Sequence, residues 1–217
     1  MIVCEKVFKG AIFDMDGTIL ESMGVWQEIT TRFLINRSLP IIEEDMEAYK
    51  DMTLDESMRY IKNKYNLKES PEELNREFNG LVANAYIYEI DAKPGVVEYI
   101  KKLKKQGVRI AIATSGYREL CEAAMKRLKM SDLIDAYALS SEVGVNKSNP
   151  DVYLLAAERI GVNPKECMVF EDIVLGIEGA KKAGMQTTAV YDEYNAQDTE
   201  NLKNISDYYI RSWNELL

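Results

Sequence analysis

Two aspartates, Asp14 and Asp16, stand one residue apart in the stretch Phe13-Asp14-Met15-Asp16-Gly17-Thr18. Residues 7–13 before them are mostly apolar and partly aromatic, which predicts a buried strand. Side chains two residues apart on a strand share one face, but a bend is needed to bring both carboxylates to one site at the strand's end, and Gly17 allows it. Carboxylates placed there can transfer protons or bind a cation. An acidic turn without chemistry is the alternative that this segment alone leaves open.

The composition narrows the chemistry. The 217 residues include no histidine, which excludes Ser-His and Cys-His catalytic pairs and every histidine-ligated zinc site. Acid–base work must therefore fall to carboxylates, lysine or tyrosine. The cysteines Cys4, Cys121 and Cys167 are scattered without a CxxC pair, so no disulfide framework is expected.

Charge and hydropathy limit the partners and the compartment. The formal net charge of −9 argues against a nucleic-acid partner. Neither a signal-length apolar stretch at the start nor a run near the roughly 18 apolar residues of a membrane helix is present, so a cytoplasmic protein without a membrane partner is expected. The sequence does not indicate the oligomeric state.

The spacing of the apolar residues changes twice along the chain. From Glu21 to about Glu89 the apolar residues recur at helical spacing, whereas from Lys93 onwards helices alternate with short apolar strands. Alternation of this kind predicts a parallel sheet with helices on both faces. We therefore expect an α/β fold, in which residues 1–20 and 93–217 form a Rossmann-like parallel-sheet core and residues 21–92 form an inserted all-α cap over its carboxyl edge. The two connections are expected to act as hinges.

Ligands of such a sheet bind beyond the carboxyl ends of its strands. The polar residues that follow successive predicted strands are Asp14 and Asp16, then Thr114-Ser115-Gly116, then Lys147, then Glu171-Asp172. Each group alone has an ordinary explanation: a strand-to-helix turn for the Thr-Ser pair, a surface charge for Lys147, a helix cap for the acidic pair. Only their joint placement favours chemistry.

The joint placement favours phosphoryl transfer. Carboxylates meeting at one edge would repel one another without a cation, and Mg²⁺ prefers hard oxygen ligands. The hydroxyls of Thr114 and Ser115 and backbone amides near Gly116 would bind phosphate oxygens, and Lys147 would add a positive charge. We therefore expect Mg²⁺ as the cofactor and a small phosphorylated metabolite, such as a sugar phosphate, as the partner.

These motifs, in this order, resemble the haloacid dehalogenase superfamily, in the branch of small phosphatases and beta-phosphoglucomutases with a helical cap. The likeness covers nearly the whole chain. It implies a phosphoric monoester hydrolase with Asp14 as nucleophile, Asp16 as general acid and base, Thr114 as phosphate ligand and Lys147 as charge clamp. It further implies a Mg²⁺ site made by Asp14, the backbone carbonyl of Asp16 and Asp172, with Glu171 in support.

The chain departs from the family pattern at two positions. Ile173 stands where a serine or threonine commonly follows the acidic pair, and Ser148 stands where a proline often follows the lysine. We expect these changes to tune the site without removing it.

Four rival functions differ in the residues that each would need. No G-x-G-x-x-G follows Phe13, which argues against a dinucleotide-binding module, and Asp16 argues against a dehalogenase. A sugar-phosphate mutase would keep all four motifs and is the main alternative, and a non-catalytic interaction protein is the lesser one.

The predicted cap favours hydrolysis over the mutase reaction. Trp26 and Lys50 are the candidate substrate contacts there. By the resemblance, beta-phosphoglucomutases carry a histidine where Trp26 stands and an arginine where Leu54 stands, whereas Lys50 matches them. Leucine cannot replace the bidentate phosphate contact of a guanidinium. The sequence does not identify the physiological substrate.

Overall fold

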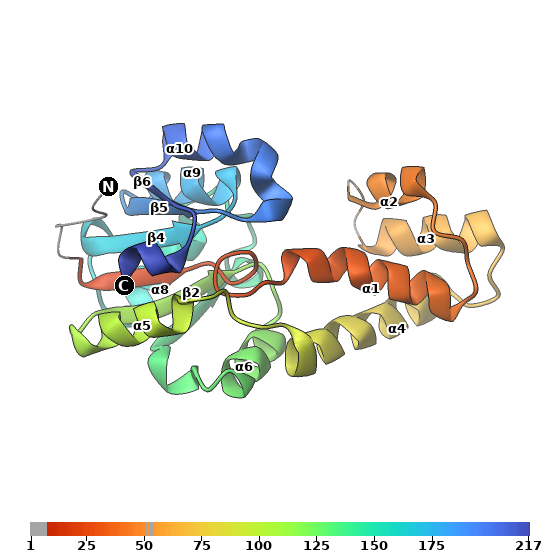
Figure 1. Ribbon diagram of the computed structural model, residues 1–217, viewed down its shortest axis with the longest axis horizontal. Coiled ribbons are helices and arrows are strands. Elements are labelled where there is room, and N and C mark those ends of the chain that lie inside the picture. The colour runs from red at the N-terminus through yellow and green to blue at the C-terminus, as the bar shows by residue number, and fades with distance from the viewer. Residues whose placement is uncertain (1–7, 51, 53) are drawn as a thin grey trace. The chain divides into compact units, whose positions relative to one another are not determined.

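The computed structural model describes residues 8–50, 52 and 54–217, and it divides the chain into two compact units (Figure 1). The core unit runs up to Ser22 and resumes at Ile90, and the helical unit spans Met23–Glu89. The expectation that the helical unit caps the sheet stays a prediction.

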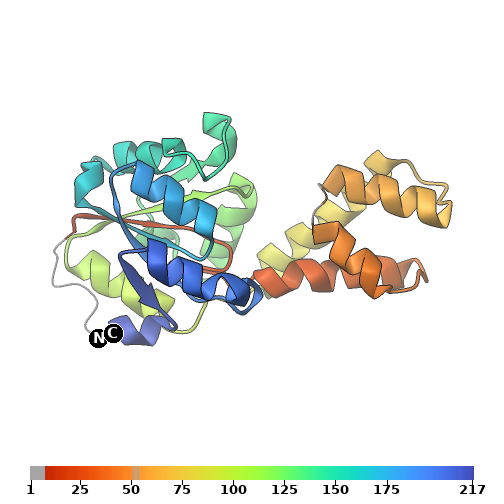
Figure 2. The ribbon, with the colours of Figure 1, turned by 90° about the horizontal axis from the view of Figure 1, so that it is seen from above.

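The helical unit contains no strand among its described residues. Its elements are α1 (Met23–Asn36), α2 (Glu43–Lys50), α3 (Leu54–Tyr65), α4 (Pro71–Asn84) and a π-helical turn, η1 (Ala85–Glu89). The start of α4 is fixed by a reciprocal capping box between Ser70 and Glu73. The apolar faces of α1 and α4 meet where Phe33 packs edge-on against Phe78, with ring centroids 5.6 Å apart. The two helices lie side by side in Figures 1 and 2.

The core unit is built on a sheet of six parallel strands in the order β3-β2-β1-β4-β5-β6. The strands are β1 (Gly10–Phe13), β2 (Arg109–Thr114), β3 (Ala136–Leu139), β4 (Cys167–Glu171), β5 (Gln186–Val190) and β6 (Tyr208–Ile210). The α/β fold expected from the sequence is thus confirmed. The first strand was expected to start at Val7, a position outside the described residues.

Helices connect the strands. They are α5 (Val96–Lys105), α6 (Arg118–Arg127), α7 (Ser140–Val143), α8 (Asp151–Ile160), α9 (Val174–Lys182) and α10 (Thr199–Ile205), with short 3₁₀ turns η2 (Ser131–Leu133), η3 (Pro164–Glu166), η4 (Glu193–Asp198) and η5 (Trp213–Leu216). The sequence pattern did not reveal α10 or the 3₁₀ turns, since each is too short to show a period. No helix in the described part of the chain combines the length and apolar character needed to cross a bilayer.

Successive side chains of β1 point to opposite faces of the sheet and pack against a different layer on each. Ile12 packs into a buried cluster with α8 residues such as Tyr153 and Ala156. Phe13 points the opposite way, stacks on Phe170 at 4.7 Å between ring centroids and contacts Trp213 of η5. Helices lie on both sides of the sheet in Figure 2.

The order of the strands locates the switch point of the sheet. The chain moves outward from β1 to β2 and β3, then returns across the sheet to place β4 on the other side of β1. The switch point is therefore between β1 and β4, and in open parallel sheets ligands bind at the carboxyl ends of the strands at this point.

A partly buried ion pair joins α2 to α3 in the helical unit. Asp45 is 4% exposed and accepts hydrogen bonds from Lys64 Nζ at 2.5 Å, Tyr60 OH at 2.9 Å and Tyr65 OH at 3.1 Å. Burial would raise the pKa of Asp45, but these donors outweigh it and hold the pKa below its usual value.

Replacing this carboxylate, as in Asp45→Asn, should destabilise the helical unit by about 1–3 kcal/mol because donors lose a charged acceptor. A depressed folded pKa stabilises above the unfolded pKa of about 3.9, and the effect is lost as pH falls through the folded value. The difference in thermal unfolding midpoint between wild type and variant should therefore be largest at neutral pH and should shrink below about pH 4. The control is Asp55→Asn, which removes an exposed pair with Arg59 and should change the midpoint little. Equal effects of the two substitutions would contradict the assignment.

Candidate active site

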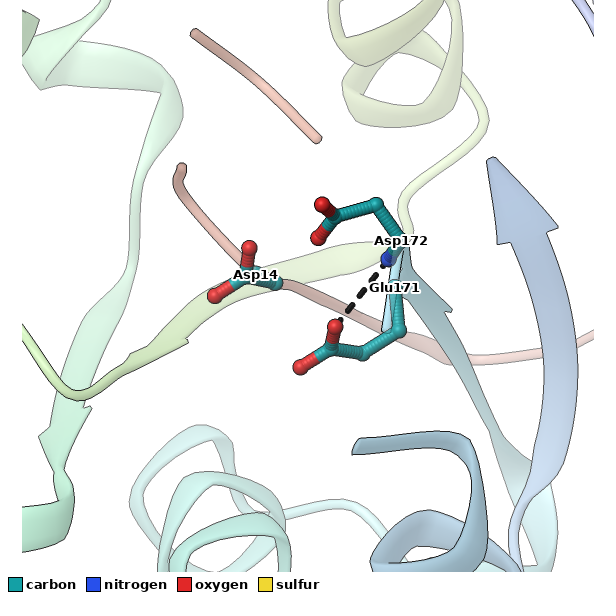
Figure 3. Close-up of side chains that lie close together, drawn as sticks. All are labelled: Asp14, Glu171 and Asp172. Atoms are coloured by element: carbon teal, nitrogen blue, oxygen red, sulfur yellow. Dashed lines mark hydrogen bonds between the residues drawn. The ribbon is translucent and has the colours of Figure 1, made fainter. Parts of the chain in front are cut away.

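Three buried carboxylates gather where β1 and β4 end. Asp14, Glu171 and Asp172 each place a carboxylate oxygen within 4.8 Å of the others, and we call them the acidic cluster (Figure 3). Asp14 follows β1 directly, and its backbone N–H donates to Phe170 O at 2.9 Å, which keeps it in register with β4. The exposed fractions are 6%, 0% and 1% in chain order. The cluster therefore lies at the switch point of the sheet.

Lys147 brings a positive charge into the cluster. Its side chain is 6% exposed, and its ammonium group donates a hydrogen bond to Asp14 Oδ1 and lies 2.5 Å from Glu171 Oε1. Burial alone would lower the pKa of Lys147, but Asp14 and Glu171 raise it instead. Lys147 is thus held charged between two carboxylates. A solvated surface lysine, the ordinary alternative, is excluded by its burial.

The cluster holds more negative charge than Lys147 can balance. Burial raises the pKa of Asp14 and of Glu171, even though Lys147 opposes it in both, and raises the pKa of Asp172 well above its usual range. Nearby carboxylates raise each pKa further. A divalent cation that prefers oxygen ligands would reduce the repulsion between these carboxylates. The donor set therefore fits a divalent cation such as Mg²⁺, and its binding by Asp14 and Asp172 stays a prediction.

Glu171 is bound at both oxygens. Its Oε1 also accepts from Tyr153 OH at 2.9 Å, and its Oε2 accepts from the backbone N–H groups of Asp172 and Ile173 at 3.0 and 3.3 Å. These contacts fit the supporting role implied by the resemblance. A direct metal contact by Glu171 stays a prediction.

A tight turn carries Asp16 next to the loop after β2. Gly17 has φ of 78°, a left-handed conformation that favours glycine, and its N–H donates to Leu20 O at 3.0 Å. Asp16 Oδ1 accepts from Ser22 Oγ at 2.6 Å. Its carboxylate is not part of the acidic cluster. Asp16 nevertheless lies near enough to Asp14 for its charge to raise the pKa of Asp14. A backbone-carbonyl contact of Asp16 with Mg²⁺ stays a prediction.

The predicted phosphate-binding residues lie at the end of β2, whose last residue is Thr114, and in the loop that follows. Thr114 is 1% exposed, and its Oγ1 accepts from the Gly116 N–H at 2.9 Å. A Cβ added to Gly116 would lie 3.9 Å from Asp16 Oδ2, so this loop approaches the acid–base candidate. Ser115 is exposed and its hydroxyl lies 3.1 Å from Ser140 Oγ, beyond β3. Phosphate binding by Thr114, Ser115 and Gly116 stays a prediction.

The two candidate substrate residues belong to the helical unit. Trp26, in α1, is 42% exposed and stacks on Phe78 of α4 at 6.4 Å. Lys50 ends α2, but its side chain lies outside the described residues. Their roles stay predictions.

Two glycines of α9 let the parts of the site approach. A Cβ at Gly176 would overlap the Glu171 carboxylate, and one at Gly179 would overlap the carbonyl oxygen of Lys147. Neither glycine has a positive φ, so helix geometry does not require them. They are needed for close packing of α9 against the lysine loop and β4.

Sequence reasoning missed four side chains that contact the site: Thr18, Ser22, Tyr153 and Asn195. Thr18 lies within the first motif and could have been recognised there. Tyr153 could have been suspected as a polar group on the apolar face of its helix. Ser22 and Asn195 carry no local signal in the sequence, because only the fold brings Ser22 to Asp16 and Asn195 to Asp172.

Comparison with known proteins agrees with the fold. Residues 11–190 match the family model described as haloacid dehalogenase-like hydrolase. A phosphorylated carbohydrates phosphatase of Thermotoga maritima is 26% identical over 82% of this chain and 82% of its own. The fructose-1-phosphate phosphatase of Escherichia coli strain K12 is 29% identical over 84% of this chain and 96% of its own. The structure of a candidate beta-phosphoglucomutase from Thermotoga maritima superposes with a TM-score of 0.83, at 23% identity and 96% coverage of both chains.

We expect two glycine-to-alanine substitutions, one in α9 and one in α4, to have opposite effects on stability. Gly179→Ala should lower the free energy of unfolding by about 1–3 kcal/mol and reduce activity, because the new methyl group displaces the loop that carries Lys147. The matched control is Gly80→Ala in α4, where nothing lies within 4 Å of an added Cβ. It should raise stability by about 0.5–1 kcal/mol through helix propensity. Denaturant titration and turnover measure both. A Gly179→Ala enzyme as stable and active as wild type would refute the close packing.

Proposed function

The chain belongs to the haloacid dehalogenase-like hydrolase family, and we propose that it is a Mg²⁺-dependent phosphatase that hydrolyses small phosphomonoesters through a phosphoaspartate at Asp14. The observation that carries this proposal is the buried contact of Lys147 with Asp14 beside Glu171 and Asp172. It holds a carboxylate in one orientation at the switch point of the sheet, where ligands enter.

In the first step Asp14 is the nucleophile. Lys147 binds Oδ1, which leaves attack on phosphorus to the second oxygen. A bond forms from that oxygen to phosphorus as the ester P–O bond breaks. Asp16, in its acid form, gives its proton to the departing oxygen, so the alcohol leaves neutral. Splitting the displacement in two avoids one difficult step.

In the second step water attacks the phosphoaspartate. Asp16, now a carboxylate, takes the proton of the attacking water, and the bond from phosphorus to Asp14 breaks. Inorganic phosphate leaves, Asp14 is restored as a carboxylate and Asp16 is again an acid. Ser22 Oγ, bound to Asp16 Oδ1 at 2.6 Å, orients that carboxyl group for both transfers.

The remaining residues hold charge and phosphate. Asp14 and Asp172 would bind Mg²⁺, which when bound neutralises the phosphoryl oxygens. Thr114, Ser115 and Gly116 would hold phosphate oxygens, and the Gly116 N–H now bonded to Thr114 would reorient to do so. Glu171 holds Lys147 in place by its 2.5 Å contact.

The relatives indicate the class of substrate. One is named for phosphorylated carbohydrates and another for fructose 1-phosphate. We therefore propose a small phosphorylated carbohydrate, with Trp26 and Lys50 of the helical unit contributing to its selection. The exposed indole of Trp26 offers an apolar surface to a sugar ring.

The two aspartates should fail in different ways on p-nitrophenyl phosphate, whose leaving group needs no proton. Asp16→Asn should release nitrophenolate in a burst equal to the enzyme concentration, then turn over about 10²–10⁴-fold more slowly than wild type, because only the second step lacks its base. Asp14→Asn should show neither burst nor turnover. Rapid-quench kinetics with MgCl₂ measures both.

Circular dichroism of both variants provides the control for folding. A burst from Asp14→Asn would assign the nucleophile elsewhere. Absence of any Mg²⁺-dependent phosphate release by the wild type would favour the non-catalytic interaction protein.

The main alternative, a sugar-phosphate mutase, differs in the fate of the phosphoaspartate. A mutase must keep water out until the sugar has turned round, which needs a firm hold on the distal phosphate. Leu54 and Trp26 cannot provide it through charge. With beta-glucose 1-phosphate and a trace of the bisphosphate, free phosphate should therefore form faster than glucose 6-phosphate. Faster formation of glucose 6-phosphate would identify a mutase.

A further inference from the structure

Asp172 receives a short hydrogen bond from a residue far along the chain. Asn195 Nδ2 donates to Asp172 Oδ2 at 2.6 Å, and Thr18 Oγ1 donates to Asp172 Oδ1 at 3.2 Å. One donor comes from the turn after β1 and the other from η4, after β5. Both oxygens of this buried carboxylate are therefore fixed in direction.

The residue that follows Asp172 in the sequence cannot orient its carboxylate. Ile173 follows Asp172, and its side chain has no hydrogen-bond donor. A buried carboxylate without donors would be free to turn, because no hydrogen bond would fix its direction or offset the cost of its burial. Neutral donors orient it without adding a charge that would repel a cation.

The segment that carries Asn195 is itself anchored. Asp192 is 7% exposed, and its carboxylate lies 2.7 Å from Lys93 Nζ and accepts from the Tyr194 N–H at 2.9 Å. Lys93 Nζ also donates to Tyr191 O at 2.9 Å. Asn195 N–H in turn donates to Asp192 O at 3.2 Å, at a break in the 3₁₀ turn. These contacts hold the Asn195 side chain toward the acidic cluster.

We propose that Asn195 is a positioning residue that orients Asp172 for Mg²⁺, with η4 serving as its rigid support. The inference rests on the metal site of the proposed function. Groups that hold a metal ligand from behind raise the affinity for the metal by fixing the ligand's direction before binding. Asn195 hydrogen-bonds Asp172 and acts through it.

The test measures metal binding without substrate. MgCl₂ is titrated by isothermal calorimetry into wild type, Asn195→Ala and the control Gln197→Ala, which changes an exposed residue of the same turn. Asn195→Ala should weaken Mg²⁺ binding about 10–100-fold, whereas Gln197→Ala should leave it within about twofold. Asp172→Ala, which removes the ligand itself, should weaken binding at least as much.

A second readout separates positioning from plain structural support. Thermal unfolding is followed with and without MgCl₂. A positioning role predicts that Asn195→Ala reduces the rise in midpoint caused by Mg²⁺ more than it lowers the metal-free midpoint. An Asn195→Ala protein with wild-type Mg²⁺ affinity, or with equal losses of midpoint in both conditions, overturns this inference and leaves the phosphatase proposal standing. A wild-type protein that binds no Mg²⁺ overturns the metal site and this inference together.

Discussion

The contact of Lys147 with Asp14 and Glu171 is the interaction on which the rest of the structure depends. Three carboxylates within 4.8 Å of one another, each nearly without solvent, would not stay charged together in an apolar interior. One ammonium offsets part of this repulsion and fixes the direction of Asp14. The negative charge that remains is a property of the fold, and it would favour binding of a divalent cation beside these carboxylates.

Backbone packing makes this contact possible. Lys147 comes from the long connection between β3 and β4, and it reaches the cluster only because α9 presents glycine, and no Cβ, to the carbonyl groups of residues 147 and 149. Gly176 does the same for Glu171. On the opposite face of the sheet, Trp213 Nε1 donates to Thr18 O at 3.1 Å and packs against Phe13. The turn that carries Asp16 is thus supported by Trp213 of η5.

The candidate catalytic and metal-binding carboxylates are therefore held by residues from several segments of the core unit. Thr18, Ser22 and Asn195 each orient one carboxylate, and they come from the first turn, the end of the first core segment and the region after β5. Lys93 links the segment after the helical unit to that last region through Asp192. A shared edge of a parallel sheet allows this, because each strand delivers its next few residues to the same place.

The sequence by itself determined the fold class, the family and the main candidate residues. Apolar strands alternating with helices can be buried in few ways, and the polar residues after Phe13, Ala113 and Phe170 mark strand ends directly. Only the tertiary structure decided that Lys147 is buried against Asp14, that Asp16 stands apart from the acidic cluster, and that Asn195 faces Asp172. These facts depend on side-chain direction and on contacts across more than 20 residues of chain, which no local pattern records. Short elements such as η4 escaped prediction for a related reason: their conformation is set by Asp192 and Lys93 rather than by any periodicity of their own.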